Sequence, residues 1–421
     1  MLRTDLAATL REDELAPGLV RPAWEDYCFG NVGDTVLSLF GDDARRPLPE
    51  DVFDGVDTDA VEHVVVALVD GFGWNHFRRV RSDHPFLDTL AERATVTPLT
   101  SIYPSETAAA ITAHNTATQP CEHGVLGWWA YLDELGTTMQ TLPFADADDD
   151  PIAQRHDTDA SVLVDERPVY DRLSGDSVVV APAGQVDSSY SRQATRGARH
   201  RDYRNVAQGA YRVREELEAA TEPTYCYLYM PSVDSLAHHA GVGHPETDAQ
   251  LGSVLDALER EVVELLDPAV AEQTLLVVTA DHGEVDATPE TTVDLRDVAL
   301  DEHLRRDANG DPLRPLGGPR NLQFHAREGH RDALVEAIES GLDPLDPVVM
   351  TREELLEADL FGDREPSDRF ERRCPDVLAV PRDGFADVTD EALSYVGMHG
   401  GMHPDEMLVP FAAATVDSLQ D

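Results

Sequence analysis

Four short runs of apolar residues, many of them β-branched, constrain the fold of this chain more than any other feature. Their sequences are VEHVVVALVD (61–70), SVVVAPA (177–183), TYCYLYM (224–230) and TLLVVTA (274–280). Continuous apolar runs of this length are typical of strands that are buried on both faces of a parallel sheet. Helical patterns lie between them, over 205–220 and 246–266. Buried strands that alternate with helices predict an α/β fold with a doubly wound, mostly parallel sheet.

Two stretches of the chain fit this alternation poorly. Residues 138–170 are rich in Asp and Pro and predict a long loop, while residues 284–395 mix short strands, turns and one clear helix. We interpret the second stretch as a cap subdomain inserted into the core. The chain is therefore expected to consist of an α/β core over 1–283 with an N-terminal wrap over 1–55, the cap, and a return to the core over 396–421.

The composition of the chain narrows the class of protein. A length of 421 residues allows a sizeable core, and 42% hydrophobic residues exclude a disordered chain. No apolar run reaches the length of about 18 residues that a membrane-spanning helix needs, and the acidic residues near the N-terminus do not fit a secretory signal. The four cysteines are far apart and form no C-x-x-C pair. We therefore expect free thiols and a cytoplasmic protein with no membrane association.

The charge of the chain is strongly acidic. Lysine is absent, and 81 acidic residues against 33 basic residues give a formal net charge of −48. Such a balance argues against a basic face that binds nucleic acid or an anionic membrane. The acids are spread along the whole chain. This pattern resembles that of proteins from extreme halophiles, in which concentrated salt screens the self-repulsion of an acidic surface.

Acidic and histidine side chains follow three of the predicted strands at the point where each strand ends. Asp70 closes the first strand, Asp234 and His238 follow the third, and Asp281 and His282 follow the fourth. In an open parallel sheet, ligands bind beyond the carboxyl ends of the strands. Carboxylates and imidazoles are ligands for zinc or manganese. One such pair alone is more often a surface group, but three placements at strand ends predict a metal site.

The segment TSIYPSETAAAITAHNTA (100–117) contains a candidate nucleophile. Its pattern predicts a strand end, a turn at Pro104 and a helix with Thr107 in its first turn. The free N–H groups and the dipole at a helix N-terminus stabilise an anion, and a bound metal ion would lower the pKa of the hydroxyl further. A plain N-cap role for Thr107 or Ser105 is the alternative reading. Ser101 and Ser105 are rival nucleophiles.

A glycine-rich loop near the C-terminus offers a further ligand. The segment YVGMHGGMHPDEMLVPF (395–411) contains His399 and His403, and its last residues predict a strand that would bring the loop to the same edge of the sheet. His399 is the stronger candidate, because the glycines on both sides of it allow the backbone to approach a metal centre closely.

Together these segments resemble the alkaline phosphatase superfamily, and within it most of all the type I phosphodiesterase/nucleotide pyrophosphatase branch. The matching segments occur in the order found in that family and cover most of the chain outside the two variable stretches. They are LVDGFG, PSETAAAITAHNTATQPCEHGVLG, DSLAHH, TADHGE and GMHGGMHPDEMLVP. Each motif alone is weak, but the set is specific. The resemblance implies an alkaline phosphatase-like α/β core and the hydrolysis of phosphate esters.

The resemblance also implies a centre with two divalent metal ions, zinc first and manganese as the alternative. Thr107 aligns with the threonine nucleophile of the family. The ligands would be the groups singled out above: Asp234, His238 and His399 for one ion, and Asp70, Asp281, His282 and the oxygen of Thr107 for the other.

One position departs from the pattern of the family. Trp128 stands where the nucleotide pyrophosphatases have an asparagine that helps to bind a phosphoryl oxygen, so a preference for nucleotides is left open. The expected partner is a small phosphorylated substrate, with a nucleotide as one candidate. Arg320, in the predicted cap, is a candidate substrate contact.

The expected function is therefore the hydrolysis of phosphodiester or nucleotide pyrophosphate bonds through a threonine nucleophile. Isomerases of the phosphoglycerate mutase and phosphopentomutase type share the metal core, but they commonly use serine and manganese. A phosphomonoesterase or a phosphonate hydrolase on the same core is a further alternative. A sulfatase fits less well, because no C-x-P-x-R motif occurs near residues 101–110. A binding protein without catalysis would not be expected to keep the complete ligand set.

Overall fold

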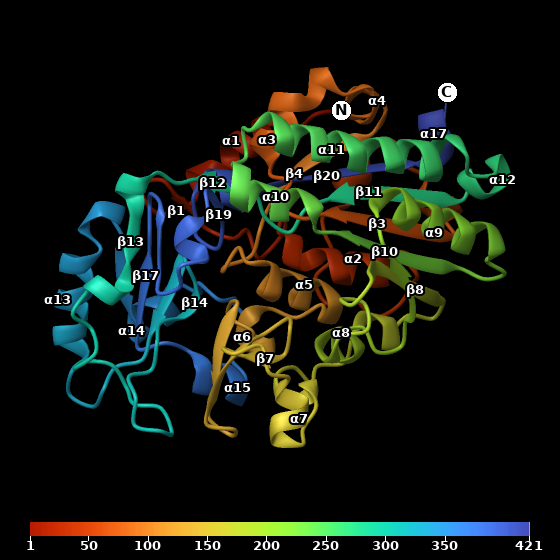
Figure 1. Ribbon diagram of the computed structural model, residues 1–421. Coiled ribbons are helices and arrows are strands. Elements are labelled where there is room, and N and C mark those ends of the chain that lie inside the picture. The colour runs from red at the N-terminus through yellow and green to blue at the C-terminus, as the bar shows by residue number, and fades with distance from the viewer. Residues whose placement is uncertain (421) are drawn as a thin grey trace.

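The computed structural model describes residues 1–420; residue 421, the last of the predicted C-terminal return, lies outside the described residues. The core is a seven-stranded sheet with helices on both faces (Figure 1). Only β20 is antiparallel to its neighbours, which confirms the predicted α/β class with a mostly parallel sheet. In spatial order the strands are β4 (Thr95–Thr100), β20 (Leu408–Thr415), β11 (Thr274–Thr279), β3 (His63–Val69), β10 (Thr224–Met230), β8 (Asp176–Pro182) and β9 (Arg199–Tyr203).

The four predicted strands all form inside this sheet. β10 has the predicted bounds, and β3, β8 and β11 differ from the predicted ranges by no more than two residues at either end. Every residue of β3 and of β11 is buried. Burial on both faces is the reason why these runs are continuously apolar and do not alternate with polar residues.

Helices cover the two faces of the core sheet (Figure 1). The predicted helix over 246–266 begins as α11 and ends in a π-helical turn over Glu259–Glu264. One face carries α2 (Val32–Leu39), α5 (Thr107–Thr116) and α8 (Ser189–Ala194). The other carries α3 (Trp74–Val80), α4 (Pro85–Arg93), α9 (Val206–Ala219), α10 (Ser232–Ala240), α11 (Pro245–Leu258) and α17 (Val416–Gln420).

A second seven-stranded sheet stands beside the core, and all of its strands are antiparallel (Figure 1). Its helices are α13 (Arg331–Gly341), α14 (Arg352–Glu357) and α15 (Asp368–Arg373). In spatial order its strands are β16 (Val348–Thr351), β17 (Val377–Val380), β15 (Asn321–Phe324), β14 (Leu316–Gly318), β5 (Trp129–Leu132), β6 (Thr137–Gln140) and β7 (Ala145–Asp146).

The second sheet takes strands from both variable stretches of the sequence. Residues 138–170, which we expected as a long loop, contain the end of β6, all of β7 and the short helix α7 (Ile152–His156). Buried Met139, Phe144 and Ile152 anchor this stretch in the main core, and the surrounding Asp and Pro residues hide that apolar pattern in the sequence. The division of the chain into a core over 1–283 and a cap over 284–395 stays a prediction.

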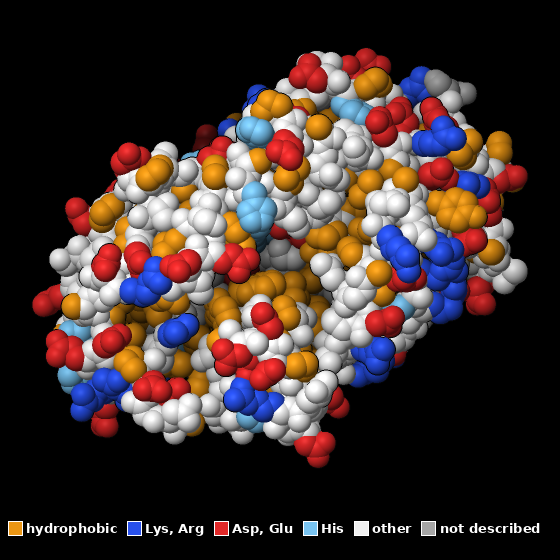
Figure 2. Space-filling view, viewed as in Figure 1, with side chains coloured by type: hydrophobic (Ala, Val, Ile, Leu, Met, Phe, Trp, Pro, Cys, Tyr) orange, Lys and Arg blue, Asp and Glu red, His pale blue; other side chains and the backbone are white. Residues whose placement is uncertain are grey.

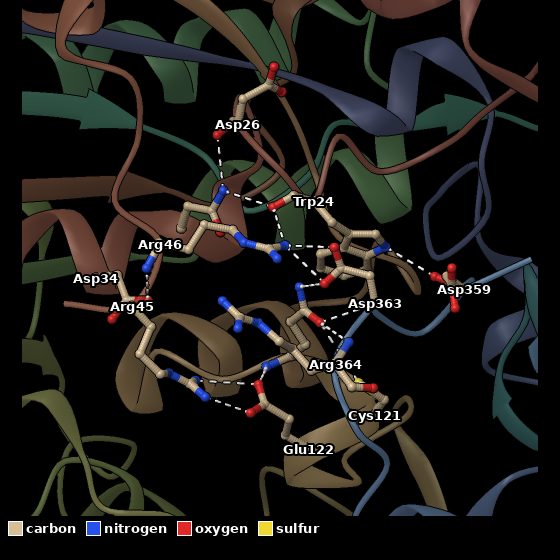
Figure 3. A network of polar contacts seen from close by, with 12 residues as sticks. Trp24, Asp26, Asp34, Arg45, Arg46, Cys121, Glu122, Asp359, Asp363 and Arg364 are labelled. Atoms are coloured by element: carbon tan, nitrogen blue, oxygen red, sulfur yellow. Dashed lines mark hydrogen bonds and ion pairs between the residues drawn. The ribbon is translucent and has the colours of Figure 1, made fainter.

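The N-terminal segment does more than wrap the surface. Its helix α2 packs on α5, and a Cβ on Gly33 would lie only 2.3 Å from the backbone oxygen of His114. The segment also joins the core to the region beside the second sheet through the polar network in Figure 3. In that network Arg46 pairs with Asp363 at 2.8 Å, and Arg45 pairs with Glu122 of α6 (Pro120–His123) at 2.6 Å.

Candidate active site

The side chains predicted at the strand ends converge at the carboxyl edge of the core sheet. Asp70 directly follows β3, Asp281 and His282 follow β11, and Asp234 and His238 lie on α10, just after β10. His282 Nε2 lies 3.3 Å from Asp70 Oδ1 and 3.5 Å from Asp281 Oδ2. His238 Nε2 lies 3.4 Å from Asp234 Oδ1. Residues that directly follow three separate strands thus lie at one edge of the sheet.

The C-terminal loop adds His399 to this site. The loop precedes β20, and the antiparallel direction of β20 places its start at the carboxyl ends of the parallel strands. His399 Nε2 lies 3.5 Å from Asp234 Oδ1, and its ring stacks on that of His282 with the centroids 3.6 Å apart. Two groups of ligand atoms result, each within 4.8 Å: Asp234, His238 and His399 in one, and Asp70, Asp234 and His282 in the other.

The three histidines of the site turn the same ring nitrogen toward the carboxylates. A backbone carbonyl can only accept a hydrogen bond, so a ring nitrogen paired with one carries the proton. The Nδ1 atoms of His238, His282 and His399 donate in this way, at 2.8, 3.0 and 3.0 Å, to the carbonyls of Gly397, Gly283 and Ser105. The Nε2 atoms therefore carry no proton and offer a lone pair, which is the state in which histidine binds a metal ion.

The carboxylates of the site are buried without enough hydrogen-bond donors. Asp70 and Asp281 have 1% and 0% of their surface exposed. Asp70 Oδ1, Asp234 Oδ1 and both side-chain oxygens of Asp281 have no hydrogen-bond partner among the described residues. Burial, followed by repulsion from Asp281 and Asp234, raises the pKa of Asp70 well above its usual value. A cluster of buried carboxylates with unpartnered oxygens fits bound cations, because a cation would offset both desolvation and repulsion.

Thr107 lies at the start of α5, beside these clusters. Its Oγ1 is 3.0 Å from His282 Nε2. The rival hydroxyls are occupied, since Ser101 Oγ donates to the carbonyl of Asp281 at 2.5 Å and Ser105 Oγ donates to the carbonyl of Gly401 at 2.8 Å. Figure 2 shows a hollow with a largely hydrophobic floor between the surface over α10 and the surface over α6 and β7.

Three residues near the site, the partly buried Tyr229 and the buried Glu106 and Glu284, had not been singled out from the sequence. Tyr229 OH donates to Asp70 Oδ2 at 2.6 Å. Glu284 is buried and directly follows Asp281, His282 and Gly283 in the sequence. Glu106 precedes Thr107 and accepts from Asn321 Nδ2 at 3.0 Å, while burial raises its pKa to about 8. The two glutamates were visible as acids within otherwise apolar or small-residue motifs, TADHGE and PSETAAA, but nothing in the sequence shows that Tyr229 meets Asp70.

Arg320, His403 and Trp128, which the sequence analysis also considered for the site, lie in surroundings different from those of the proposed metal ligands. Arg320, expected as a substrate contact, is fully buried and pairs with Glu406 at 2.7 Å, so the expectation was wrong. A buried Arg–carboxylate pair cannot reach substrate without breaking. His403 caps α16 (Pro404–Met407) through its Nδ1 and belongs to neither group of ligand atoms. Trp128 keeps 36% of its surface exposed, and its backbone N–H donates to Glu106 Oε2 at 2.7 Å.

Comparison with known proteins gives the family. The model of the type I phosphodiesterase/nucleotide pyrophosphatase family matches residues 64–402, which is most of the chain. The chain belongs to this family. The protein is therefore a phosphoester hydrolase of this family, whose members depend on metal ions, and the two groups of carboxylates and histidines are its candidate metal-binding groups. A comparison with curated protein sequences gives no match.

Solved structures of this phosphodiesterase-like fold resemble the chain at low sequence identity. Murine ectonucleotide pyrophosphatase/phosphodiesterase 5, as an inactive variant in complex with AMP, has a TM-score of 0.62 and 16% identity over 84% of this chain and 87% of its own. The human counterpart has a TM-score of 0.59 and 16% identity with the same coverage. Phosphonoacetate hydrolase from Sinorhizobium meliloti 1021, in complex with phosphonoformate, has a TM-score of 0.59 and 17% identity over 90% of this chain and 97% of its own.

The helices of this phosphodiesterase family member give no sign of a membrane span. None of those within residues 1–420 combines the length and the apolar character needed to cross a bilayer.

Proposed function

We propose that the protein hydrolyses small phosphodiesters, or nucleotide pyrophosphates, with Thr107 as nucleophile in a centre that binds two divalent cations. The observation that carries this proposal is the position of Thr107 Oγ1, 3.0 Å from His282 Nε2 and beside the two groups of candidate ligands. A helix N-cap alone would not need this contact. Zinc is the proposed metal because of the nitrogen and oxygen donors, and manganese is the alternative.

The residues of the site fit the proposed cations. Bound here, divalent cations would polarise phosphoryl oxygens and lower the pKa of a hydroxyl. Asp234 reaches both groups of ligand atoms and so lies between the two proposed positions. The proposed ligands are Asp234, His238 and His399 for one cation, and Asp70, Asp281, His282 and Thr107 Oγ1 for the other.

The chain supplies the nucleophile and part of the charge stabilisation. The Thr107 hydroxyl gives its proton to solvent, and its Oγ1 attacks phosphorus in line with the leaving group. The bond between phosphorus and the leaving oxygen breaks, and the leaving group departs as an anion or takes up a proton from water. The product is a phosphothreonyl ester, which water then hydrolyses by attack on phosphorus, with release of Thr107. The first N–H groups of α5 point toward the site and stabilise the negative charge on the phosphoryl oxygens.

A phosphonate is the second substrate candidate. Trp128 occupies the position at which we expected an asparagine in a nucleotide pyrophosphatase, and its exposed side chain offers no amide for a phosphoryl oxygen. This observation favours a substrate other than a nucleotide. The fold of phosphonoacetate hydrolase, which the chain matches over 97% of that protein, shows that a phosphonate is bound on the same scaffold.

Thr107→Ala tests the proposal. The wild-type protein, loaded with Zn²⁺ or Mn²⁺ in high salt, is expected to hydrolyse bis-p-nitrophenyl phosphate faster than p-nitrophenyl phosphate. Thr107→Ala should lose at least about 1,000-fold in kcat, because no other free hydroxyl replaces the nucleophile. Thr107→Ser is the matched control and should keep measurable activity. A Thr107→Ala protein with an unchanged metal content and an unchanged diesterase rate would contradict the mechanism.

The acidic composition supports two further proposals about where the protein works. We propose that it functions in concentrated salt, because acidic side chains are scattered over the face in Figure 2 and the net charge is −48. We also propose a reducing cytoplasm, because all four cysteines are buried and unpaired. The region over 284–395 is proposed to act as a cap beside the active site.

A further inference from the structure

The helix that presents Thr107 has little large apolar surface with which to pack. All ten residues of α5 are buried, four of them are alanines, and Ile111 is the only large aliphatic residue among them. Helices settle against their neighbours when ridges of large side chains fit into grooves, and alanines form only shallow ridges. Apolar packing alone therefore fixes the position of α5 poorly, although the place of Thr107 depends on it.

Buried polar contacts define the position of α5 more sharply. Three tyrosine hydroxyls from separate parts of the chain bind polar side chains of this helix. They are Tyr190 of α8, at 2.6 Å from Thr112 Oγ1, Tyr170, which donates to Asn115 Oδ1 at 2.8 Å, and Tyr225 of β10, at 2.8 Å from His114 Nε2. Buried polar groups that find their partners rigidify a structure and specify one arrangement of its elements.

His114 has a single partner for its side chain. The ring is buried, with 1% of the residue exposed, and burial lowers the pKa of His114 to about 3, so the ring is neutral. Its Nδ1 has no hydrogen-bond partner among residues 1–420. Because a buried N–H without a partner is rarer than a buried acceptor without one, we assign the ring proton to Nε2. The Nε2–H group then donates to the Tyr225 hydroxyl.

The strand that carries Tyr225 also supports the proposed metal site. Tyr225, Tyr227 and Tyr229 alternate along β10 and so lie on one face of the sheet. Tyr225 meets His114 of α5, and Tyr229 donates to Asp70 at 2.6 Å. One face of β10 thus contacts both the helix of the proposed nucleophile and a proposed ligand.

We propose that Tyr225 is a positioning residue for the nucleophile, because its hydrogen bond with His114 sets the place of α5 along β10 and so the place of Thr107 Oγ1. This inference rests on the proposed function. His114 lies about 10 Å along the helix from Thr107, so a shift of the helix at His114 moves Thr107 as well. A displacement of about 1 Å at a reacting atom lowers a rate by up to about 100-fold.

Tyr225→Phe tests the inference, because it removes one hydroxyl and keeps the ring. With Zn²⁺-loaded protein and bis-p-nitrophenyl phosphate, we expect kcat to fall about 10- to 100-fold, while KM and the Zn²⁺ affinity change less than about threefold. Tyr227→Phe is the matched control, because the Tyr227 hydroxyl is buried without a partner, and it should keep the wild-type kcat. An unchanged kcat in Tyr225→Phe, or an equal loss of Zn²⁺ affinity, would overturn the inference.

His114 offers a second pair of variants if Tyr225→Phe does not fold. His114→Leu removes the donor and should lower kcat as much as Tyr225→Phe. His114→Gln places an amide N–H near the position of Nε2 and should recover most of that loss. Equal values of kcat in His114→Leu and His114→Gln would overturn the inference.

Crystal structures decide the role of Tyr225 independently of activity. In Tyr225→Phe, α5 should be displaced along β10, with Thr107 Oγ1 farther from His282 Nε2 than the 3.0 Å of the wild type. An α5 helix in its wild-type place would overturn the inference. If the wild type hydrolyses no phosphate ester, the proposed function fails, while this structural comparison still decides whether Tyr225 positions the helix.

Discussion

At the scale of single residues, the site depends on groups that hold the proposed ligands in place. Tyr229 is the clearest case, because its hydroxyl donates to the buried Asp70 carboxylate at 2.6 Å. A hydrogen bond to an ionised carboxylate fixes the direction in which the second oxygen points. Tyr229 is therefore a positioning residue for the group of ligands that contains Asp70.

Replacement of Tyr229 by phenylalanine should weaken metal binding without unfolding the protein. The Asp70 carboxylate would lose its donor, so we expect Zn²⁺ affinity to fall about 10- to 100-fold in titrations of the stripped protein. Tyr227→Phe is the matched control on the same face of β10, because the Tyr227 hydroxyl is buried without a partner. Equal affinities in the two variants would argue against a positioning role for Tyr229.

Much of the candidate site could be predicted from residue types at strand ends. The structure brings Asp70, Thr107 and Asp234 together with the predicted histidines, because the carboxyl ends of parallel strands share one edge. Their roles stay proposals. Contacts that depend on packing could not be predicted, and Glu284 between two motif glycines is an example. Arg320 was wrongly expected to contact substrate, because the sequence does not show that it pairs with the buried carboxylate of Glu406.

At the scale of secondary-structure elements, the contact between α2 and α5 sets the position of the helix that presents Thr107. The two helices approach so closely that only glycine fits at Gly33. The sequence did not show this contact, because residues 1–55 carry the composition of a surface segment. The apolar strands were predictable, whereas β6 and β7 were not, since each is short and contains a single apolar residue beside Thr, Gln or Asp.

Gly33→Ala should therefore destabilise the fold. The new Cβ would meet the His114 carbonyl at 2.3 Å, so α2 must shift. We expect the free energy of unfolding to fall by about 1–3 kcal/mol, as for other overpacked interiors. Gly252→Ala on α11 is the matched control, because its Cβ would have no neighbour closer than 4.0 Å. Denaturant unfolding in high salt measures both, and equal stabilities would contradict the close contact.

At the scale of the whole molecule, the net charge of −48 should make stability depend on salt. Screening shortens the range of repulsion between surface acids, from about 8 Å at 0.15 M to about 3 Å at 1 M. The thermal unfolding midpoint should therefore rise steadily with KCl. Sucrose at matched osmolality is the control, because it is preferentially excluded from the protein surface but does not screen charge. A midpoint that is highest in dilute buffer would contradict the proposed adaptation to salt.

We propose that residues from four distant parts of the chain hold two divalent cations around the Thr107 hydroxyl. A crystal structure of the Zn²⁺-loaded protein with anomalous scattering at the zinc edge tests this arrangement. We expect two anomalous peaks, one among Asp234, His238 and His399 and one among Asp70, Asp281, His282 and Thr107. A single peak, or peaks away from these residues, would contradict it.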